Sequence, residues 1–226
     1  MAQELTLPLE AKSDPPASEE GAQERVKGSI WTVQFSPCGR YLAAGGQDGL
    51  VRLWCLVEQK SKVSPAPSPH SSIFSDEPMR RWEGHKGDVM DLAWSKNNFL
   101  LSASMDRTVR LWHVSRAACL YVFPHPDFVT SVSFHPKDDR CFLSGSIDGR
   151  MRLWSVPEKK VVQWEEVHGL CTAAARHHSA MLVIAGTVGG KCLFYSMEGR
   201  SSLTHQESSN WSVRGGKKVT SILPVP

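Results

Sequence analysis

Short runs of alternating apolar and polar residues recur along this chain, separated by turn residues. The clearest stretch is residues 84–114, in which an alternating run, a Ser-Ala-Ser-Met-Asp turn and a second run ending in Leu111-Trp112 follow a Gly-His pair. Period-two alternation indicates strands that pack through their faces, and the turn residues mark where the chain reverses. The stretch therefore predicts three short antiparallel strands.

The same pattern returns at a nearly fixed spacing. Four turn positions are each followed six residues later by an aromatic residue, and these aromatics are Trp54, Trp112, Trp154 and Tyr195. They are separated by 58, 42 and 41 residues. A period of about 40–45 residues with Gly-His at one end and Trp at the other is typical of propeller blades. On these residues, 28–195 resemble the WD-repeat family.

The resemblance implies an all-β fold, an incomplete WD-repeat β-propeller of about four four-stranded antiparallel blades. It also implies buried hydrogen-bonded tetrads of His, Ser, Asp and Trp, whose members here are His85, Ser102, Asp106, Trp112, His125, Ser144, Asp148 and Trp154. A His, Ser and Asp could instead form a hydrolytic triad. Because the set occurs twice, we expect a structural role and no catalytic residue.

Two repeats depart from the family pattern. In the first, the His position falls on Val26 and the Ser position on Ala44, which leaves Asp48 and Trp54 without tetrad partners. In the fourth, 169–195, the Ser, Asp and Trp positions hold Ala185, Gly189 and Tyr195, so that no tetrad is expected.

Changes in composition along the chain predict its domain boundaries. Residues 1–27 are polar and predict a flexible leader, and the blades are expected over 28–200. A Ser/Pro-rich insertion, 58–78, should join the third and fourth strands of the first blade. Its two Ser-Pro pairs make Ser64 and Ser68 candidate phosphorylation sites, with a plain spacer as the alternative. Residues 201–226 are expected to form a polar connection and the opening strand of a fifth blade, as in a truncated propeller.

The overall composition is that of an ordinary globular protein. The 226 residues carry a formal net charge of +3 and are 41% hydrophobic, which does not favour nucleic acid as a partner. No run is long enough to span a membrane and the N-terminus has no signal pattern, so we expect a cytoplasmic protein. The six scattered cysteines lack zinc spacing, and neither a metal nor a cofactor is expected.

Several segments, among them 28–40, 91–116 and 127–154, also resemble the WD-repeat protein that binds a Rab GTPase of recycling endosomes. That resemblance implies a non-enzymatic scaffold for protein partners in vesicle trafficking, peripheral on endosomal or Golgi membranes. The Rab-binding segment of that relative precedes its propeller, and residues 1–27 do not resemble it. Open blade edges would also allow self-association.

Two other functions are alternatives to the trafficking scaffold. A substrate receptor of a ubiquitin ligase would carry Trp-Asp-x-Arg after a blade, and none of the three repeat tryptophans is followed by it. Phosphoinositide-binding propellers carry Phe-Arg-Arg-Gly, for which residues 214–218 supply basic charge but not the motif.

A partner surface is predicted at the narrow mouth of the propeller. In WD-repeat blades, the residues three and five after the His position and the residue before the turn Asp lie there. The large apolar residues at these positions are Trp31, Met90, Met105, Phe128 and Ile147. Aromatic and methionine side chains are frequent anchors of protein interfaces, although burial in the core is the common alternative for each.

Overall fold

The structure, a computed structural model, describes residues 28–56, 74–75, 77–167, 169, 171–176, 182–198, 202–205, 218–220 and 222. Across these residues the chain forms sixteen β-strands, which make four antiparallel sheets of four strands each. Within each sheet, neighbouring strands are consecutive in the chain. The predicted all-β fold of about four four-stranded antiparallel blades is confirmed.

The four blades follow the order of the chain. Blade 1 contains β1 (Ile30–Phe35), β2 (Tyr41–Gly46), β3 (Val51–Cys55) and β4 (Arg80–Trp82). Blade 2 contains β5 (Val89–Trp94), β6 (Phe99–Ser104), β7 (Thr108–His113) and β8 (Tyr121–Pro124). Blade 3 contains β9 (Val129–His135), β10 (Asp138–Ser146), β11 (Arg150–Ser155) and β12 (Lys160–Glu166). Blade 4 contains β13 (Cys171–Arg176), β14 (Leu182–Thr187), β15 (Cys192–Glu198) and β16 (Ser202–His205).

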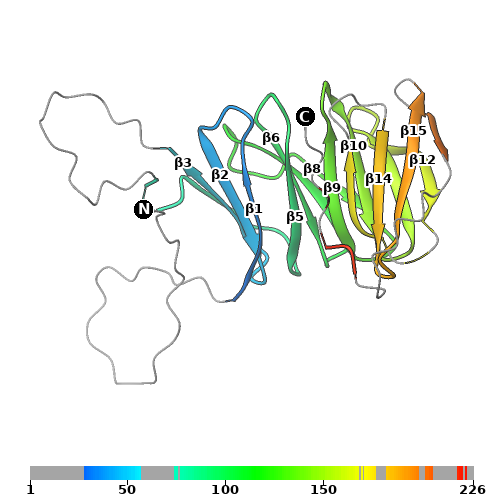
Figure 1. The fold of residues 1–226 in the computed structure, drawn as a ribbon. Helices are drawn as coiled ribbons and strands as arrows, with labels where there is room; N and C mark the ends of the chain where they lie inside the picture. The colour runs from blue at the N-terminus through cyan, green and yellow to red at the C-terminus, as the bar shows by residue number, and fades with distance from the viewer. Residues whose placement is uncertain are drawn as a thin grey trace, which may run out of the picture.

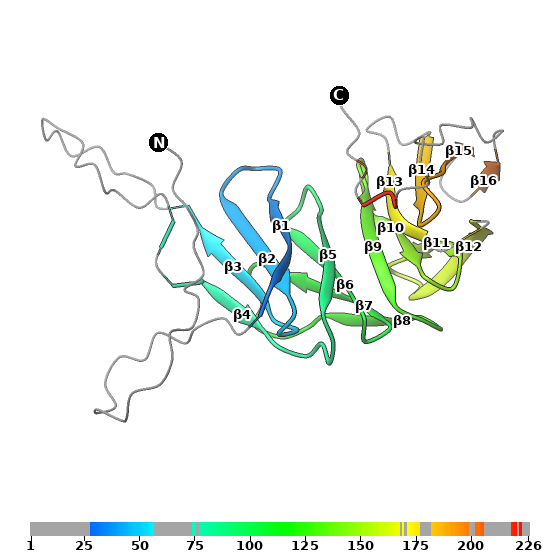
Figure 2. The same ribbon diagram turned by 60° about the horizontal axis from the view of Figure 1, so that its bottom comes forward.

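The blades stand side by side, from blade 1 in blue to blade 4 in orange (Figures 1 and 2). The first strands of successive blades contact one another, β1 with β5, β5 with β9, and β9 with β13. These first strands line a shared hollow of about 670 Å³. The fourth strand of each blade therefore lies on the outside, with a sheet partner on one edge only.

The hydrophobic core lies between the blades. Trp82 of blade 1 stacks on Trp112 of blade 2, with their ring centroids 5.5 Å apart. Phe123 of blade 2 contacts Phe142 and Trp154 of blade 3 at centroid distances of 4.8 Å and 5.4 Å. Alternation along the strands gives each blade two apolar faces, and stacking against both neighbours buries them.

A short segment after blade 4 repeats the contacts of an innermost strand. Val219 packs against Gly186 as Val89 packs against Gly45, since a Cβ added to either glycine would lie 2.5 Å from the valine Cγ1. The hydroxyl of Thr172 donates to the carbonyl of Val219 at 2.6 Å. In Figure 2 this red segment lies beside β13. Residues 218–220 and 222 thus occupy the place that the opening strand of another blade would take.

One segment differs from its predicted boundary. Blade 4 extends to His205 because β16 pairs with β15, whereas a polar connection was expected from residue 201. An outermost strand is solvated along one edge, so it does not need the apolar pattern that reveals an inner strand. The insertion joins β3 to β4, and a bridge between Leu56 and Phe74 brings its two ends together. The leader 1–27, Ser64 and Ser68 lie outside the described residues.

Candidate functional site

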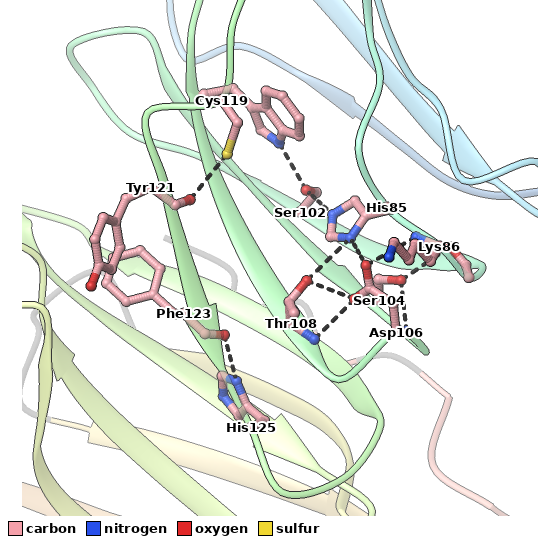
Figure 3. Close-up of polar contacts among 12 residues, drawn as sticks. His85, Lys86, Ser102, Ser104, Asp106, Thr108, Cys119, Tyr121, Phe123 and His125 are labelled. Carbon is pink, nitrogen blue, oxygen red and sulfur yellow. Dashed lines mark hydrogen bonds and ion pairs between the residues drawn. The ribbon is translucent and has the colours of Figure 1, made fainter.

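A chain of hydrogen bonds runs through the centre of blade 2 (Figure 3). The indole N–H of Trp112 donates to Ser102 Oγ at 2.8 Å, and Ser102 Oγ lies 2.6 Å from Nε2 of His85. His85 Nδ1 lies 2.7 Å from Oδ2 of Asp106. Thr108 adds its hydroxyl and its amide to Oδ1 of the same carboxylate, at 2.6 Å and 2.9 Å. The carboxylate thereby ties the β6–β7 turn to the loop that enters the blade.

The charge of this network is set by its hydrogen bonds. Burial raises the pKa of Asp106, but hydrogen bonds from His85 and Thr108 lower it more, so the pKa of this carboxyl lies well below its usual value. The ionised carboxylate orients the imidazole with Nδ1–H toward it, which leaves Nε2 to accept from Ser102. The order Trp, Ser, His, Asp is therefore a directed chain of donors.

The linked Ser102, His85 and Asp106 have the connectivity of a hydrolytic triad. However, Ser102 is fully buried, and its oxygen already accepts from Trp112. A nucleophilic hydroxyl must reach a substrate carbonyl, which this one cannot do. The geometry supports a structural role for the network.

Blade 3 has only part of the predicted tetrad. Trp154 donates to Ser144 Oγ at 2.9 Å, and Ser144 Oγ lies 2.8 Å from His125 Nε2, as in blade 2. However, Nδ1 of His125 donates to the carbonyl of Phe123 at 3.0 Å, and Asp148 binds the guanidinium of Arg152 instead. The prediction of a tetrad that includes Asp148 is therefore wrong. Burial lowers the pKa of His125 to about 4.

The residue before the histidine accounts for this difference. In blade 2, Arg110 occupies the position of Arg152, and its guanidinium lies over Gly84, at the place where a side chain on that glycine would project. In blade 3 the residue before His125 is Pro124, whose ring leaves no such place. We infer that Arg152 turns toward Asp148 for this reason, and a charged two-pronged partner then outcompetes the imidazole.

The other two blades replace the tetrad in different ways. In blade 1, Asp48 does have a partner, because Arg52 Nη2 lies 2.7 Å from its Oδ2. In blade 4, Tyr195 stands at the Trp position, is fully buried, and directs its hydroxyl to the carbonyl of Glu166 at 3.5 Å. Burial raises the pKa of Tyr195 to about 12.

The rim positions are arranged by a backbone hydrogen bond that recurs in three blades. The amide of the residue before the turn Asp donates to the carbonyl of the residue three after the His position. The donor–acceptor pairs are Gln47–Ser29 at 2.9 Å, Met105–Asp88 at 2.9 Å and Ile147–Phe128 at 3.1 Å. This bond holds each turn beside the start of its innermost strand and gathers the predicted residues at one end of the blades.

None of the five predicted rim residues is buried in the core. Trp31 is 51% exposed and Met105 38%, while Met90, Phe128 and Ile147 are partly exposed. The indole N–H of Trp31 donates to Oδ2 of Asp88 at 3.0 Å, which fixes a blade 1 side chain against blade 2. The guanidinium of Arg107 lies 5.8 Å from the ring centroid of Phe128. The rim thus presents aromatic and other large apolar side chains to solvent, among which Trp31 is held by its bond to Asp88.

Sequence reasoning missed one half-buried carboxylate in the hollow. Oδ2 of Asp91, on β5, accepts the amide of Val132 on β9 at 2.9 Å, and its Oδ1 accepts the amide of Leu92 at 2.8 Å. Burial raises the pKa of Asp91 to about 7. No motif marks this residue, because its partner lies in the next repeat. Asp91 joins the innermost strands of blades 2 and 3.

Among the described residues, no group of three or more His, Cys, Asp or Glu side chains is placed to hold a metal ion. None of the six cysteines forms a disulfide. The same part of the chain has no helix with the length and apolar character that crossing a membrane requires.

Radially arranged four-stranded blades with a solvated rim define a β-propeller-type interaction scaffold. The chain belongs to the WD-repeat family. The family model described as "WD domain, G-beta repeat" matches residues 23–55, 76–113 and 117–155. Proteins of this family are generally non-enzymatic scaffolds, and their repeats indicate protein partners.

Three relatives cover most of the chain. WD repeat-containing protein 44 of Xenopus laevis is 42% identical over 88% of this chain and 26% of its own length. An uncharacterized WD repeat-containing protein of Schizosaccharomyces pombe is 35% identical over 88% of this chain and 37% of its own length. The 2-deoxy-glucose resistant protein 2 of Saccharomyces cerevisiae is 33% identical over 71% of this chain and 25% of its own length. The chain thus spans about a quarter to two-fifths of these relatives.

Proposed function

We propose that this chain is a scaffold in Rab-linked vesicle trafficking and endosomal recycling, and that it binds its protein partners through the rim. The partners would include a small Rab GTPase, and the protein would act in the cytoplasm and peripherally on endosomal or Golgi membranes. The trafficking role rests on the resemblance to the Rab-binding WD-repeat protein. Self-association through the open blade edges and phosphorylation at Ser64 and Ser68 belong to the same proposal.

The observation that carries the binding role is the solvated apolar rim. Large apolar side chains that are not used in the core act as interface anchors when they are held rigidly, because little conformational entropy is then lost on binding. Trp31 meets this condition, since it is half-exposed and hydrogen-bonded to Asp88. Met90 and Met105 add adaptable surface beside it.

The test is a triple variant, Trp31→Ala, Met105→Ala and Phe128→Ala. A matched control is Met79→Ala, Leu120→Ala and Val162→Ala, which removes three exposed apolar side chains that lie away from the rim. We expect the rim variant to lose partners in affinity purification with mass spectrometry, while the control keeps them and both variants melt near the wild-type temperature. Equal recovery of partners by both variants would overturn the assignment of the rim.

The Rab link needs a separate measurement. Calorimetric titration of the purified chain with a GTP-loaded and a GDP-loaded Rab GTPase of recycling endosomes should give binding that depends on GTP. If neither form binds while the rim variant still loses other partners, then the scaffold role stands and the Rab partner is wrong.

A further inference from the structure

The outermost strand of blade 3 differs from those of the other blades. β12 has seven residues, against three in β4, four in β8 and four in β16. It pairs with β11 on one side and with no strand on the other within the described part of the chain. It also carries Trp164, which is 48% exposed. Long edge strands with exposed apolar side chains are templates for another strand.

The register identifies the main-chain groups that face outward. The amide of Val167 donates to the carbonyl of Gly149 at 2.7 Å, and the antiparallel register continues through Glu165–Met151 and Gln163–Leu153. Hydrogen-bonded and non-hydrogen-bonded pairs alternate in such a ladder. Trp164 and Glu166 therefore direct their main-chain groups away from β11. The hydroxyl of Tyr195 reaches the carbonyl of Glu166. The outward groups available to an added strand are therefore the main-chain N–H and C=O of Trp164 and the N–H of Glu166.

The outermost strand of blade 2, β8, cannot pair with an added strand in this way. In blade 2 the amide of His125 donates to the carbonyl of Arg107 at 2.8 Å, as Val167 does to Gly149, so Pro124 stands where β12 has Glu166. Proline has no N–H to offer, and prolines on edge strands prevent pairing. The edge of β12 has no such block between Gln163 and Glu166.

The side chains along this edge select the chemistry of a partner strand. The guanidinium of Arg150 lies 4.2 Å from the ring centroid of Trp164 and holds the ring against the sheet. Glu166 lies on the same face of β12 as Trp164, and Glu165 lies on the other face, where its Oε1 accepts a hydrogen bond from Gln163 Nε2 at 2.8 Å. No ion pair to either carboxylate is found among the described residues. A strand added here would place an apolar residue opposite Trp164 and basic residues opposite the two glutamates.

We propose that β12 is a second binding site, at which an extended peptide of a partner protein adds as a fifth, antiparallel strand of blade 3. Read from its N-terminus, the peptide carries two basic residues followed by an apolar one, because antiparallel addition reverses the order Trp164, Glu165, Glu166. Main-chain hydrogen bonds supply the affinity, and the charge pattern supplies the selectivity. The site is separate from the rim and does not depend on the Rab link.

The probe is a fluorescein-labelled peptide, Gly-Ser-Lys-Lys-Ile-Thr-Val-Ser-Gly, titrated against the full chain by fluorescence anisotropy. We expect saturable binding that weakens about tenfold or more when the two lysines are replaced by glutamates. Trp164→Pro should abolish binding while keeping the fold, because it removes an N–H that β11 does not use. Trp164→Ala should weaken it. The control, Val162→Ala, removes an exposed side chain at the bulge where the register skips a residue, and should leave binding unchanged.

Hydrogen exchange provides a second readout that does not depend on any variant. In the wild-type chain the amides of Trp164 and Glu166 should exchange fast and become protected when the peptide is added. Binding without this protection, or no saturable binding, would overturn the proposal. If light scattering shows a dimer that Trp164→Pro abolishes, the edge pairs with a second copy of the chain, which would also overturn it.

Discussion

The strongest prediction concerns the histidine–aspartate pair of blade 2. His85 and Asp106 are joined at 2.7 Å with side chains 0% and 7% exposed, whereas His125 and Asp148 have other partners. A double-mutant cycle, His85→Ala with Asp106→Ala, should therefore give a coupling energy of about 1.5–3 kcal/mol, the range for a hydrogen bond to a charged group. The matched cycle, His125→Ala with Asp148→Ala, should give less than about 0.5 kcal/mol.

The single variants should differ from the cycle. Asp106→Ala leaves the amides of Lys86 and Thr108 and the His85 N–H without their acceptor, and should lower the free energy of unfolding by about 3–5 kcal/mol. Asp148→Ala should also be costly, because it leaves the buried Arg152 guanidinium without its counter-charge.

The assay is urea denaturation at about pH 7, followed by far-UV circular dichroism, for the wild-type chain and the six variants of the two cycles. The variants of both cycles leave every tryptophan in place, so their dichroism can be compared directly with that of the wild-type chain. Equal coupling energies in the two blades, or a coupling below about 0.5 kcal/mol in blade 2, would refute the assignment of the hydrogen bonds.

Further predictions concern single groups. Burial raises the pKa of Asp91 to about 7, whereas an aspartate in the unfolded chain titrates near 4. The native state therefore holds this proton more tightly than the unfolded state does. As a result, the free energy of unfolding should fall as the pH rises from about 4 to about 7. Asp91→Asn should remove this slope in urea melts across that range, and an unchanged slope would contradict the burial argument. The pKa of Asp106 is lowered, so its contribution is complete above about pH 4 and is lost as the pH falls further; Asp106→Asn should flatten the acid limb of the same profile. Trp112→Phe removes one donor to Ser102 and should cost about 1 kcal/mol in thermal melts beyond any loss of packing, and Ser102→Ala should make the two changes non-additive. Because none of the six cysteines forms a disulfide, reductant should leave the melting temperature of freshly purified protein unchanged.

The sequence by itself determined the repeat and most of the strands. The second strands of the blades are placed by short runs of mostly apolar or small residues, because successive side chains point to opposite faces and both faces are buried. The Trp six residues after the turn marks the end of each third strand, as at Trp54, Trp112 and Trp154. The sequence also predicted the members of the blade 2 tetrad, which the structure joins by hydrogen bonds, whereas the role of the five rim residues as a partner surface stays a prediction. It did not reveal β16, since an outer strand with a solvated edge has little need of apolar alternation.

Only the tertiary structure decided which groups are partners. Asp148 and Asp106 occupy the same place in the repeat, yet Asp148 binds Arg152 and Asp106 binds His85. The bonds of Trp31 to Asp88 and of Asp91 to Val132 join different blades, and no pattern within one repeat encodes them. Periodicity reports which face a residue occupies. A hydrogen bond forms only when the donor–acceptor distance is right to within a few tenths of an ångström. For groups far apart in the chain, this distance is fixed only when the blades pack.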